Sequence, residues 1–419
     1  MKTKLSALFV ALTASICSLY AYETLSVAQA MEIGRALDKS AKSADTYLIT
    51  GYVVAIESEY NEQYHNQCYW ISDQPEGEIS DVFYIYRGGN DNAVQVGNKI
   101  SIEAKVFRYN NLVIENSGSP VTILDEAVAS APAILTGNCG ETGDNLTFQL
   151  NLSTWDLTIQ GSGAMVDTIA DYPWQWQNMR KAIQTIQLPE GLTMIGTSAF
   201  ENCEKVNSVV IPEGVTSIGR YAFSNCSALT TMNMPESVHN IGKAAFQGCI
   251  LTEPLYNSRL FCFLPMDYSG SYAVPDGIVA VISYSFDGRI GLTSVDLPAS
   301  VLRLGYRTFR NCKGLQSITC RAVEPPTSQG ESFEGVDKSI PLYIPAGSLE
   351  LYQEADEWSE FTNREALPDE PETPETPEED QALELTNAPL PATHKLFHNG
   401  QLLILRANRT YTLTGQAAE

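Results

Sequence analysis

The residue types that carry chemistry in enzymes are few in this chain, and none stands in a recognisable catalytic arrangement. Histidine, the usual proton carrier near neutral pH, occurs only at His65, His239, His394 and His398. The patterns G-x-S-x-G, H-E-x-x-H and C-x-x-C, which mark nucleophiles and metal or redox sites, are absent. His65 stands near Cys68, but a loop histidine beside a core cysteine is the favoured interpretation. We therefore predict no catalytic residues, no metal site and no cofactor.

Charge excludes a further class of function. The 419 residues contain 26 Lys and Arg against 50 Asp and Glu, so the formal net charge is −24. Proteins that bind nucleic acid neutralise phosphates with Lys and Arg, and a strongly acidic chain repels such a partner. Hydrophobic residues make up 44% of the chain, an ordinary proportion for a globular protein. We predict a folded protein without a nucleic-acid partner.

The first 21 residues have the layout of an export signal. Two lysines precede an apolar stretch at residues 5–16, and the small residue Ala21 precedes polar residues. That stretch is shorter than the ~20 apolar residues of a transmembrane helix, and no other stretch is long enough, so we predict no transmembrane segment. Cys17 invites a lipoprotein interpretation, but cleavage after Ala21 is favoured. We expect the protein to act at the cell surface or outside the cell, with the periplasm as the alternative.

Eight cysteines follow the export signal, and their spacing decides how they are interpreted. An even number in an exported chain suggests disulfides. However, Cys203, Cys226 and Cys249 recur every 23 residues, which places them at equivalent positions of a repeated unit. Buried thiols behave as small hydrophobic groups, so free core thiols are favoured for these three. Cys312 and Cys320 could form a disulfide, and the sequence leaves that open.

The same period extends to a whole motif. Phe200, Phe223 and Phe246 each stand three residues before one of these cysteines, and a proline stands eleven residues before each phenylalanine. After a longer interval of 40 residues the period resumes with Phe286 and Phe309. A fixed period of this length is typical of a solenoid, whose units bury their apolar faces only by stacking. We expect the phenylalanines to stack as a spine.

Each unit is predicted to begin with a short strand that ends at the proline. A second apolar pair then re-enters the core, and the segment with alanine, phenylalanine and cysteine fills the far side. Asn202, Asn225 and Asn311 are expected to bond backbone groups of the neighbouring coil. Coils should lie about 5 Å apart, the spacing of paired strands. The predicted strands are residues 183–188, 206–211, 229–234, 292–297 and 315–320.

The repeat resembles a known family. The pattern L-x-x-I-x-(I/L)-P-x-G-V-x-x-I-G-x-x-A-F-x-N-C is similar to the BspA-like leucine-rich repeat and covers about residues 183–363. The resemblance implies a mainly β fold built around a leucine-rich repeat solenoid. It also implies a cap hairpin at residues 131–182, where Tyr172-Pro-Trp174 stands, and a closing cap within the repeat region, residues 183–365. Packing in the cap is favoured over sugar stacking for these aromatic residues.

The 17 residues added between Phe246 and Phe286 are predicted to form an extra strand pair in a variant coil. The alternative is a protruding recognition loop.

Residues 22–130 form a separate predicted module. A short amphipathic helix at residues 24–37 precedes five strand-like runs, which suggest a small Greek-key barrel. This region resembles the OB-fold-like domain near the N-terminus of many Bacteroidota surface proteins, and a spacer or protein-docking role is favoured for it. The five runs are residues 47–56, 68–72, 82–86, 100–109 and 112–114.

Two segments are predicted after the repeats. Residues 366–385 are an acidic, proline-rich linker that cannot bury a core. Residues 386–419 contain two short strand-like runs and resemble the C-terminal tails of Bacteroidota secreted proteins, some of which are type IX sorting signals. The alternative for this tail is a small terminal hairpin, retained for anchoring.

The function predicted from these features is recognition outside the cell. A solenoid presents a regular, rigid surface, and the family that the repeat resembles includes surface adhesins. We therefore predict an adhesin that binds a host or bacterial protein or a glycan; the alternatives are a cell-envelope scaffold or accessory subunit and a glycan-capture protein for nutrient uptake. The candidate binding residues point outward from the strands that precede the prolines, and we name this surface the strand face. They are Thr185, Gln187, Ser208, Val210, Thr231, Asn233, Ser294, Asp296, Ser317 and Thr319.

Overall fold

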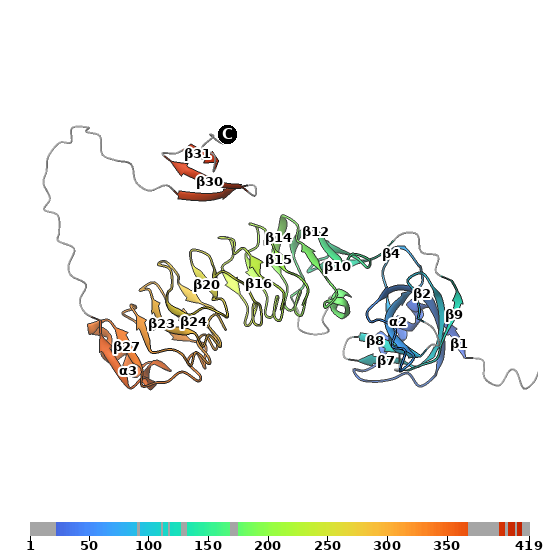
Figure 1. Cartoon of the computed structure of the whole chain (residues 1–419), viewed down its shortest axis with the longest axis horizontal. Coiled ribbons are helices and arrows are strands. Elements are labelled where there is room, and N and C mark those ends of the chain that lie inside the picture. Colours follow the sequence, from blue (N-terminus) through green and yellow to red (C-terminus); the bar gives the residue numbers. More distant parts are fainter. Residues whose placement is uncertain are drawn as a thin grey trace, which may run out of the picture. The chain divides into compact units, whose positions relative to one another are not determined.

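The chain divides into two units, residues 1–368 and residues 369–419 (Figure 1). The computed structural model describes residues 22–89, 93–109, 112–115, 118–126, 132–167, 175–367, 394–398, 401–406 and 409–412. The predicted export signal, with Cys17, and nearly all of the predicted acidic linker lie outside the described residues.

The first unit opens with a capped helix. The helix α2 (Val27–Ala36) begins after Ser26, whose hydroxyl accepts from the N–H of Gln29 while the Gln29 side chain accepts from the N–H of Ser26. This reciprocal capping satisfies two donors that a helix start leaves unpaired. The Asp73 carboxylate accepts from the N–H of Val27 at 2.6 Å and therefore ties the helix to the sheet beside it. The predicted helix is confirmed within a few residues of its predicted bounds.

A twisted sheet packs around this helix, and its core contains Val27, Val53, Tyr69 and Ile100. The strand order is β7-β8-β5-β3-β2-β6-β9, and β1 pairs with β2. Each of the five predicted runs overlaps a strand. The third run begins one residue before β5, the fourth is divided between β6 and β7, and the fifth ends one residue before β8 ends. The strands are β1 (Glu23–Leu25), β2 (Tyr47–Ile56), β3 (Asn66–Ser72), β5 (Phe83–Gly89), β6 (Lys99–Ala104), β7 (Val106–Tyr109), β8 (Leu112–Glu115) and β9 (Val121–Asp125).

The next three strands form an antiparallel meander that caps the repeats: β10 (Ala133–Gly140), β11 (Gly143–Asn151) and β12 (Asp156–Ala164). The short strand β4 (Gly77–Ile79) of the preceding module pairs in parallel with β10. The Trp70 ring meets the Trp155 ring at 5.9 Å between centroids, and both residues belong to one apolar cluster that continues into the repeats. The module before the cap is therefore packed against it.

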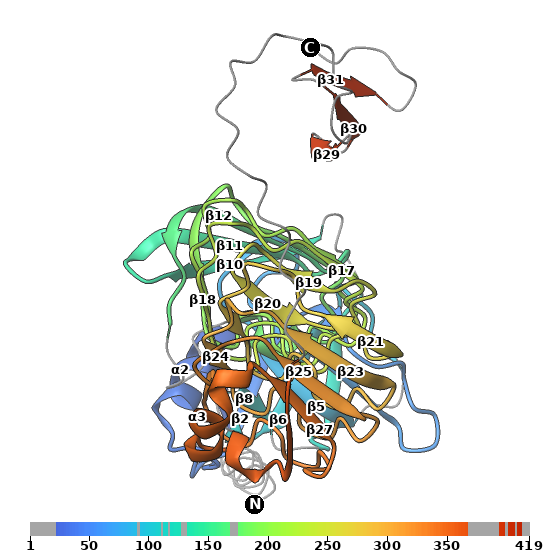
Figure 2. The same ribbon diagram turned by 90° about the vertical axis from the view of Figure 1, so that its left-hand side faces the viewer.

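The repeats form coils with two parallel sheet sides. Each coil's first strand lies on the strand face, and Figure 2 shows β21, β23, β25 and β27 side by side there. The first strands are β13 (Thr185–Gln187), β15 (Ser208–Val209), β17 (Thr231–Met232), β21 (Gly270–Ala273), β23 (Leu292–Leu297), β25 (Ser317–Cys320), β27 (Pro341–Ile344) and β28 (Asn363–Ala366). The second side comprises β14 (Gly191–Ile195), β16 (Ser217–Ile218), β18 (Asn240–Ile241), β20 (Leu260–Phe263), β22 (Ala280–Val281), β24 (Arg303–Leu304) and β26 (Thr327–Ser328).

The predicted phenylalanine spine is confirmed. The stacked rings of Phe200 and Phe223 lie 5.4 Å apart between centroids, those of Phe223 and Phe246 6.0 Å, and those of Phe286 and Phe309 4.8 Å. All five side chains are buried. Because each of these rings packs on the ring of a neighbouring coil, a repeat that could not bury its apolar face alone does so by stacking.

The eight cysteines that the structure describes are free and buried, as predicted for the three that share the repeat period. Cys312 and Cys320 do not pair. The Cys226 thiol donates to the carbonyl oxygen of Phe200 at 3.2 Å, and the Cys249 thiol donates to that of Phe223 at 3.2 Å. Each thiol therefore bonds the phenylalanine backbone of the preceding coil.

The repeated asparagines have a different role from the predicted one. Asn202, Asn225 and Asn311 have φ values of 62°, 58° and 59°, a left-handed conformation that asparagine tolerates better than most residues. The Asn225 side-chain amide donates at 3.1 Å to the side chain of Asn202 rather than to backbone. Asparagine is therefore used at this position for its backbone conformation.

The variant coil contains the predicted strand pair, because β19 (Leu255–Tyr256) pairs antiparallel with β20. It also interrupts the stack. Within residues 175–367, β18 has no ladder to β20, and the first-strand sheet resumes only at β21. The apolar core divides at the same place, with Phe263 in one cluster and Phe261 in the next. We name the coils before this junction the first stack and those after it the second stack.

A short helical segment closes the second stack: η2 (Ala346–Ser348), α3 (Leu349–Glu354) and η3 (Trp358–Glu360). The Trp358 ring N–H donates to the carbonyl of Pro326 at 2.8 Å, and the Tyr352 hydroxyl donates to that of Ala322 at 2.8 Å. The described residues of the second unit form three antiparallel strands rather than the two predicted: β29 (His394–His398), β30 (Gln401–Arg406) and β31 (Arg409–Thr412).

Candidate functional site

Parallel register arranges the strand face in columns. Ser294 pairs with Ser317 and Asp296 with Thr319 across β23 and β25, while Ser208 pairs with Thr231 across β15 and β17. Side chains alternate along a strand, so the residues between these positions point into the core. The predicted site residues divide into two groups, six in the first stack and four in the second, with the junction between them. The first six are exposed, and the last four are half-buried.

The first stack carries a shallow hollow on this face. It has a volume of about 340 Å³ and is lined in part by Thr185, Gln187, Ser208 and Val210, four of the predicted site residues. We name it the strand-face hollow. It lies between β13, which pairs with β12, and β15, which pairs with β17. Val210 is 74% exposed there, although it is a large aliphatic residue.

Asn233 is occupied by the fold. Its side-chain oxygen accepts from the N–H of Ile211 at 2.7 Å, and its side-chain nitrogen donates to the carbonyl of Ile211 at 2.8 Å. The amide therefore takes the place of a strand backbone and satisfies both polar groups of a buried residue in the preceding coil. Asn233 is exposed at its outer side, but its hydrogen-bonding groups already have partners.

Two other predicted residues are also engaged. The Asp296 carboxylate forms a two-point ion pair with Arg321, with distances of 3.0 Å from Nε and 2.9 Å from Nη2. The Thr185 hydroxyl donates to Asp156. Hydrogen bonds from Thr154 and Thr185 lower the pKa of Asp156, because they stabilise its ionised form. Of the four predicted residues that line the hollow, one, Thr185, therefore already donates its hydroxyl proton to the fold.

The structure adds three strand-face residues that the sequence reasoning missed. Ser271 pairs with Ser294, and Ala273 pairs with Asp296, so both continue the outward columns into the variant coil. Tyr343 pairs with Thr319 and extends the second column toward the closing cap. The sequence does carry a sign of these residues, because residues 270–273 and 341–344 alternate as strands do. The first segment lies in the 40-residue interval between Phe246 and Phe286, and the second lies in the region predicted as the closing cap, so neither was predicted as a strand of the repeat.

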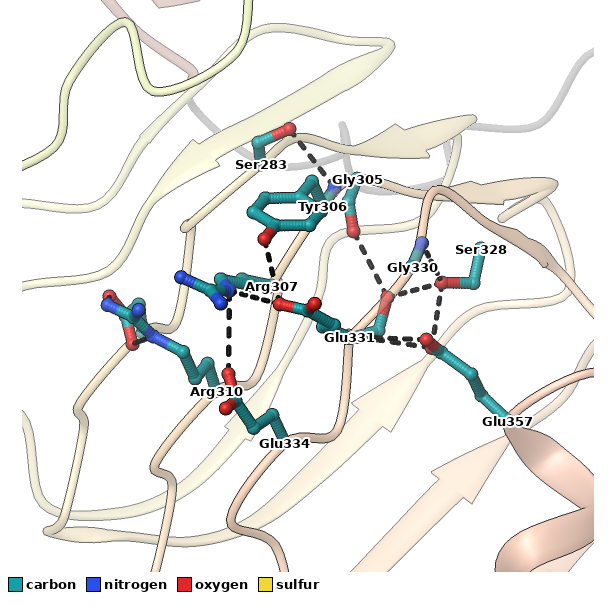
Figure 3. A network of polar contacts seen from close by, with 12 residues as sticks. Ser283, Gly305, Tyr306, Arg307, Arg310, Ser328, Gly330, Glu331, Glu334 and Glu357 are labelled. Atoms are coloured by element: carbon teal, nitrogen blue, oxygen red, sulfur yellow. Dashed lines mark hydrogen bonds and ion pairs between the residues drawn. The ribbon is translucent and has the colours of Figure 1, made fainter.

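A polar network lies outside the strand face, between the second sheet side and the phenylalanine turns (Figure 3). The Tyr306 hydroxyl donates to the Glu331 carboxylate at 2.7 Å, and Arg307 pairs with both Glu331 and Glu334. The bonds from Tyr306 and Arg307 lower the pKa of Glu331. The carboxylate is therefore ionised near neutral pH and holds no proton to donate as an acid. These contacts join residues of successive coils.

The closing cap joins the same network. The Glu357 carboxylate accepts from the Ser328 hydroxyl at 2.7 Å and from the N–H of Ser332 at 3.0 Å (Figure 3). Two successive coils and the cap are thus linked by hydrogen bonds and ion pairs.

The described residues contain neither a cluster that could hold a metal ion nor a helix that could span a membrane. Across these residues, no three His, Cys, Asp or Glu side chains lie close enough together to hold a metal ion. Of the helices that the structure describes, none is both long enough and apolar enough to cross a bilayer.

Comparison with known proteins gives one family match and several structural matches. The family model of the BspA type leucine-rich repeat region matches residues 165–263 and 260–355, with six copies. No curated protein matches the chain.

Three solved structures are similar to parts of the chain. A leucine-rich repeat protein from Eubacterium ventriosum is 17% identical, with 51% of this chain and 80% of that chain covered and a TM-score of 0.28. A leucine-rich cell surface protein from Faecalibacterium prausnitzii is 16% identical, with 53% and 93% covered and a TM-score of 0.26. The pneumococcal vaccine antigen PcpA is 12% identical, with 54% and 98% covered and a TM-score of 0.25.

The 23-residue period, the parallel ladders on two sides and the family match describe the same region. Residues 165–355 match the model of the BspA type leucine-rich repeat region, and the described part of the chain is mainly β with a solenoid over that region.

Proposed function

We propose that this chain is a non-enzymatic protein of the cell surface that binds a protein or a glycan outside the cell through its strand face. The family match to residues 165–355 supports a surface role. The observation that carries the proposal is the strand-face hollow, where Val210 is 74% exposed beside Ser208 and Gln187. A ligand would bury an aliphatic side chain and bond polar side chains at the same place.

The strand face suits binding because little of it must be ordered when a ligand arrives. Its columns are held in register by backbone ladders and by the stacked core, so the entropy cost of fixing loops on binding is avoided. Since Asn233, Asp296 and the Thr185 hydroxyl are engaged in the fold, the contacts are assigned to Gln187, Ser208, Val210 and Thr231 in the first stack and to Ser294, Ser317 and Thr319 in the second.

The test begins by capturing a ligand with the full chain from panels of host matrix proteins, mucin and glycans. The combined change Ser208→Arg and Val210→Arg should then weaken binding at least tenfold, because two long charged side chains would fill the hollow. The matched control is Thr193→Arg and Thr216→Arg, two exposed positions on or beside the opposite sheet side. Equal loss in both variants, or no loss in the first, would contradict the assignment to the strand face.

Two further experiments separate the alternatives. An adhesin must be accessible to a membrane-impermeant label on intact cells, whereas a scaffold inside the envelope is not. A glycan-capture protein would be retained on a polysaccharide affinity gel and would not bind the matrix proteins.

The N-terminal module is proposed to be an OB-like barrel that acts as a spacer or a protein-docking module. Its strand order supports this, because β2 pairs with both β3 and β6 and β5 pairs in parallel with β8. Export through residues 1–21 and sorting or anchoring through residues 386–419 belong to the same proposal. Deletion of residues 1–21 should leave the protein inside the cell. Deletion of residues 386–419 should release it into the medium.

A further inference from the structure

The second sheet side of the solenoid differs in charge from the rest of the chain. Its strands, together with the two residues that follow each of them, contain Arg220, Lys243 and Arg303 but no Asp or Glu. The whole chain has 50 acidic residues against 26 basic ones, so a surface that contains only basic charges is a local exception. Such a surface attracts anionic ligands.

A hollow opens on this side where the stack is interrupted. Asn240 ends the ladder of the first stack, and Leu260, Ala280 and Arg303 stand opposite one another in the ladders that follow. Ala280 is small and 7% exposed, so it forms a low floor with Leu260, while the exposed Asn240 and Arg303 stand at the rim. The hollow has a volume of about 110 Å³. We name it the second-side hollow.

Arg303 provides a charge that the fold leaves free. Its guanidinium has no hydrogen bond or ion pair with any residue that the structure describes. Other arginines of the second stack are engaged, because Arg307, Arg310 and Arg321 each pair with a carboxylate. None of the residues that line the hollow is acidic. An anion placed there would therefore meet an exposed guanidinium without displacing another partner.

Two side chains at the rim offer acceptors beside this charge. The Nδ1 atom of His239 lies 3.0 Å from the carbonyl oxygen of Ser237 and donates to it, which leaves Nε2 of the neutral ring as an acceptor. The side-chain nitrogen of Asn240 donates to the Ser217 hydroxyl at 3.2 Å, which leaves its side-chain oxygen available. Both residues are exposed.

The backbone of the same strand adds further acceptors. In the preceding coil, the carbonyls of Thr216 and Ile218 accept from N–H groups of the coil that contains β18, at 3.1 and 2.8 Å. His239 and Ile241 occupy the equivalent positions one coil later. Because β18 has no ladder to the variant coil, the carbonyls of His239 and Ile241 receive no backbone N–H within residues 175–367. Hydroxyl groups of a ligand could donate to them.

We propose that the second-side hollow binds a carboxylate-bearing sugar unit of an acidic glycan. The carboxylate would pair with Arg303, because a planar guanidinium matches a carboxylate at two points. Sugar hydroxyls would donate to the acceptors on His239, Asn240 and Ile241. The volume is below that of an ordinary small-molecule pocket, so the hollow would hold one unit of a longer chain.

A glycan is favoured over the other anionic polymers. An acidic peptide side chain would satisfy Arg303 but has no hydroxyl groups for the surrounding acceptors. A nucleic acid would be repelled by a chain whose formal net charge is −24. The second-side hollow is separate from the strand face, and the inference does not depend on the proposed function.

Direct binding tests the proposal. A fluorescently labelled trimer of galacturonic acid is titrated with the full chain, alongside its methyl ester, which retains the rings but has no charge. The acid should bind about tenfold more tightly than the ester, as one charge-assisted hydrogen bond would provide. A glutamate tripeptide and a short single-stranded oligonucleotide should bind more weakly than the acid. Equal binding of any of these three, or no binding of the acid, would overturn the proposal.

Variants locate the site. Arg303→Gln changes an exposed residue and should abolish the preference for the acid over the ester. The matched control Lys313→Gln removes the same charge from an exposed position of the second stack that does not line the hollow, and it should preserve the preference. Asn240→Ala should weaken binding of the acid and the ester alike, because it removes an acceptor for hydroxyl groups. A preference that survives Arg303→Gln would count against the assignment.

Failure here is distinct from failure of the proposed function. The strand-face change Ser208→Arg and Val210→Arg should leave binding of the galacturonate trimer unaltered. Loss of trimer binding in that variant would show that the glycan lies on the strand face and would contradict the second-side assignment.

Arginine modification of the wild-type chain gives a second readout that needs no variant. Phenylglyoxal should modify Arg303 faster than Arg310, which is held by the Asp287 carboxylate at 2.8 and 2.6 Å. The galacturonate trimer should slow modification of Arg303 and leave that of the exposed Arg87 in the N-terminal module unchanged. An unchanged rate at Arg303 in the presence of bound trimer would contradict the site.

Discussion

At the scale of single residues, burial in the core changes the acidity and the reactivity of the cysteine thiols. Burial raises the pKa of Cys226 and of Cys312 to about 12, and desolvation of the thiolate is the largest cause in both. A thiol that must ionise to react is therefore inert inside this stack. The donated bonds to phenylalanine carbonyls add directionality to a group that otherwise packs as a small apolar side chain.

This chemistry predicts unreactive thiols in the native chain. A thiol-reactive dye at pH 8 should label the core cysteines only after the protein is unfolded in guanidinium chloride. Fast labelling of Cys203, Cys226 or Cys249 in the native protein would contradict their burial. Cys17 lies outside the described residues and is excluded by using the chain from residue 22.

Stability should also fall at alkaline pH. The pKa of these thiols is higher in the folded chain than in the unfolded chain, where it is near 9. The unfolded state therefore loses protons first, and the stabilisation present below pH 9 declines as the pH rises toward 12. Urea unfolding between pH 7 and 10 measures this decline. Cys226→Val, which places there the residue type found at the equivalent Val336, should reduce the pH dependence, and an unchanged slope would contradict the explanation.

Asn233 provides a second prediction at this scale. Asn233→Ala should lower the free energy of unfolding by about 1–3 kcal/mol, because the buried N–H and carbonyl of Ile211 lose their partners. The neighbouring exposed change Thr231→Ala should cost no more than about 0.5 kcal/mol. Urea unfolding of both variants measures the difference, and equal values would show that the Asn233 amide does not support the ladder.

The sequence allowed the role of a residue to be predicted where that residue recurs with the 23-residue period. The phenylalanine spine and the free cysteines depend only on which residues recur, and both are confirmed. The role of Asn233 could not be predicted, because a side chain that substitutes for backbone in one coil has no repeated signal. The left-handed asparagines recur, but their period does not distinguish a conformational role from a hydrogen-bonding one.

At the scale of elements, the variant coil divides the solenoid. The interval of 40 residues predicted an extra strand pair, which β19 and β20 provide. The interval could not predict that both sheet sides would be interrupted, since strand register depends on pairing across coils rather than on spacing. A hollow lined by Phe246, Met266 and Arg310 lies at this interruption.

The division predicts unequal responses to a core substitution. Phe223→Ala should destabilise the first stack by about 3–5 kcal/mol, because a buried ring is removed between two others. Coils interact mainly with their neighbours, so the loss of stability should be confined to coils near residue 223. Amide hydrogen exchange should show lost protection over residues 183–249 and a smaller change over residues 280–344. A uniform loss across both stacks would indicate that the junction transmits stability.

At the scale of the whole molecule, the repeats place a long patterned surface on a rigid core, and the first unit joins its N-terminal module to the cap. The sequence predicted a helix and a set of strands in that module. It gave no sign that β4 would pair with β10 or that Trp70 would meet Trp155, because contacts between modules have no local periodicity. The strand face itself was predictable in outline, since alternation alone identifies which residues point outward.

Hydroxyl-radical footprinting of the full chain, with and without its captured ligand, tests the central claim most directly. Val210 is exposed in the free protein and should be oxidised readily. The strand-face proposal predicts that ligand binding slows oxidation of Val210 while leaving exposed residues of the second sheet side, such as Leu302, unchanged. Oxidation of Val210 at the same rate in the bound and free chain would contradict binding at the strand-face hollow.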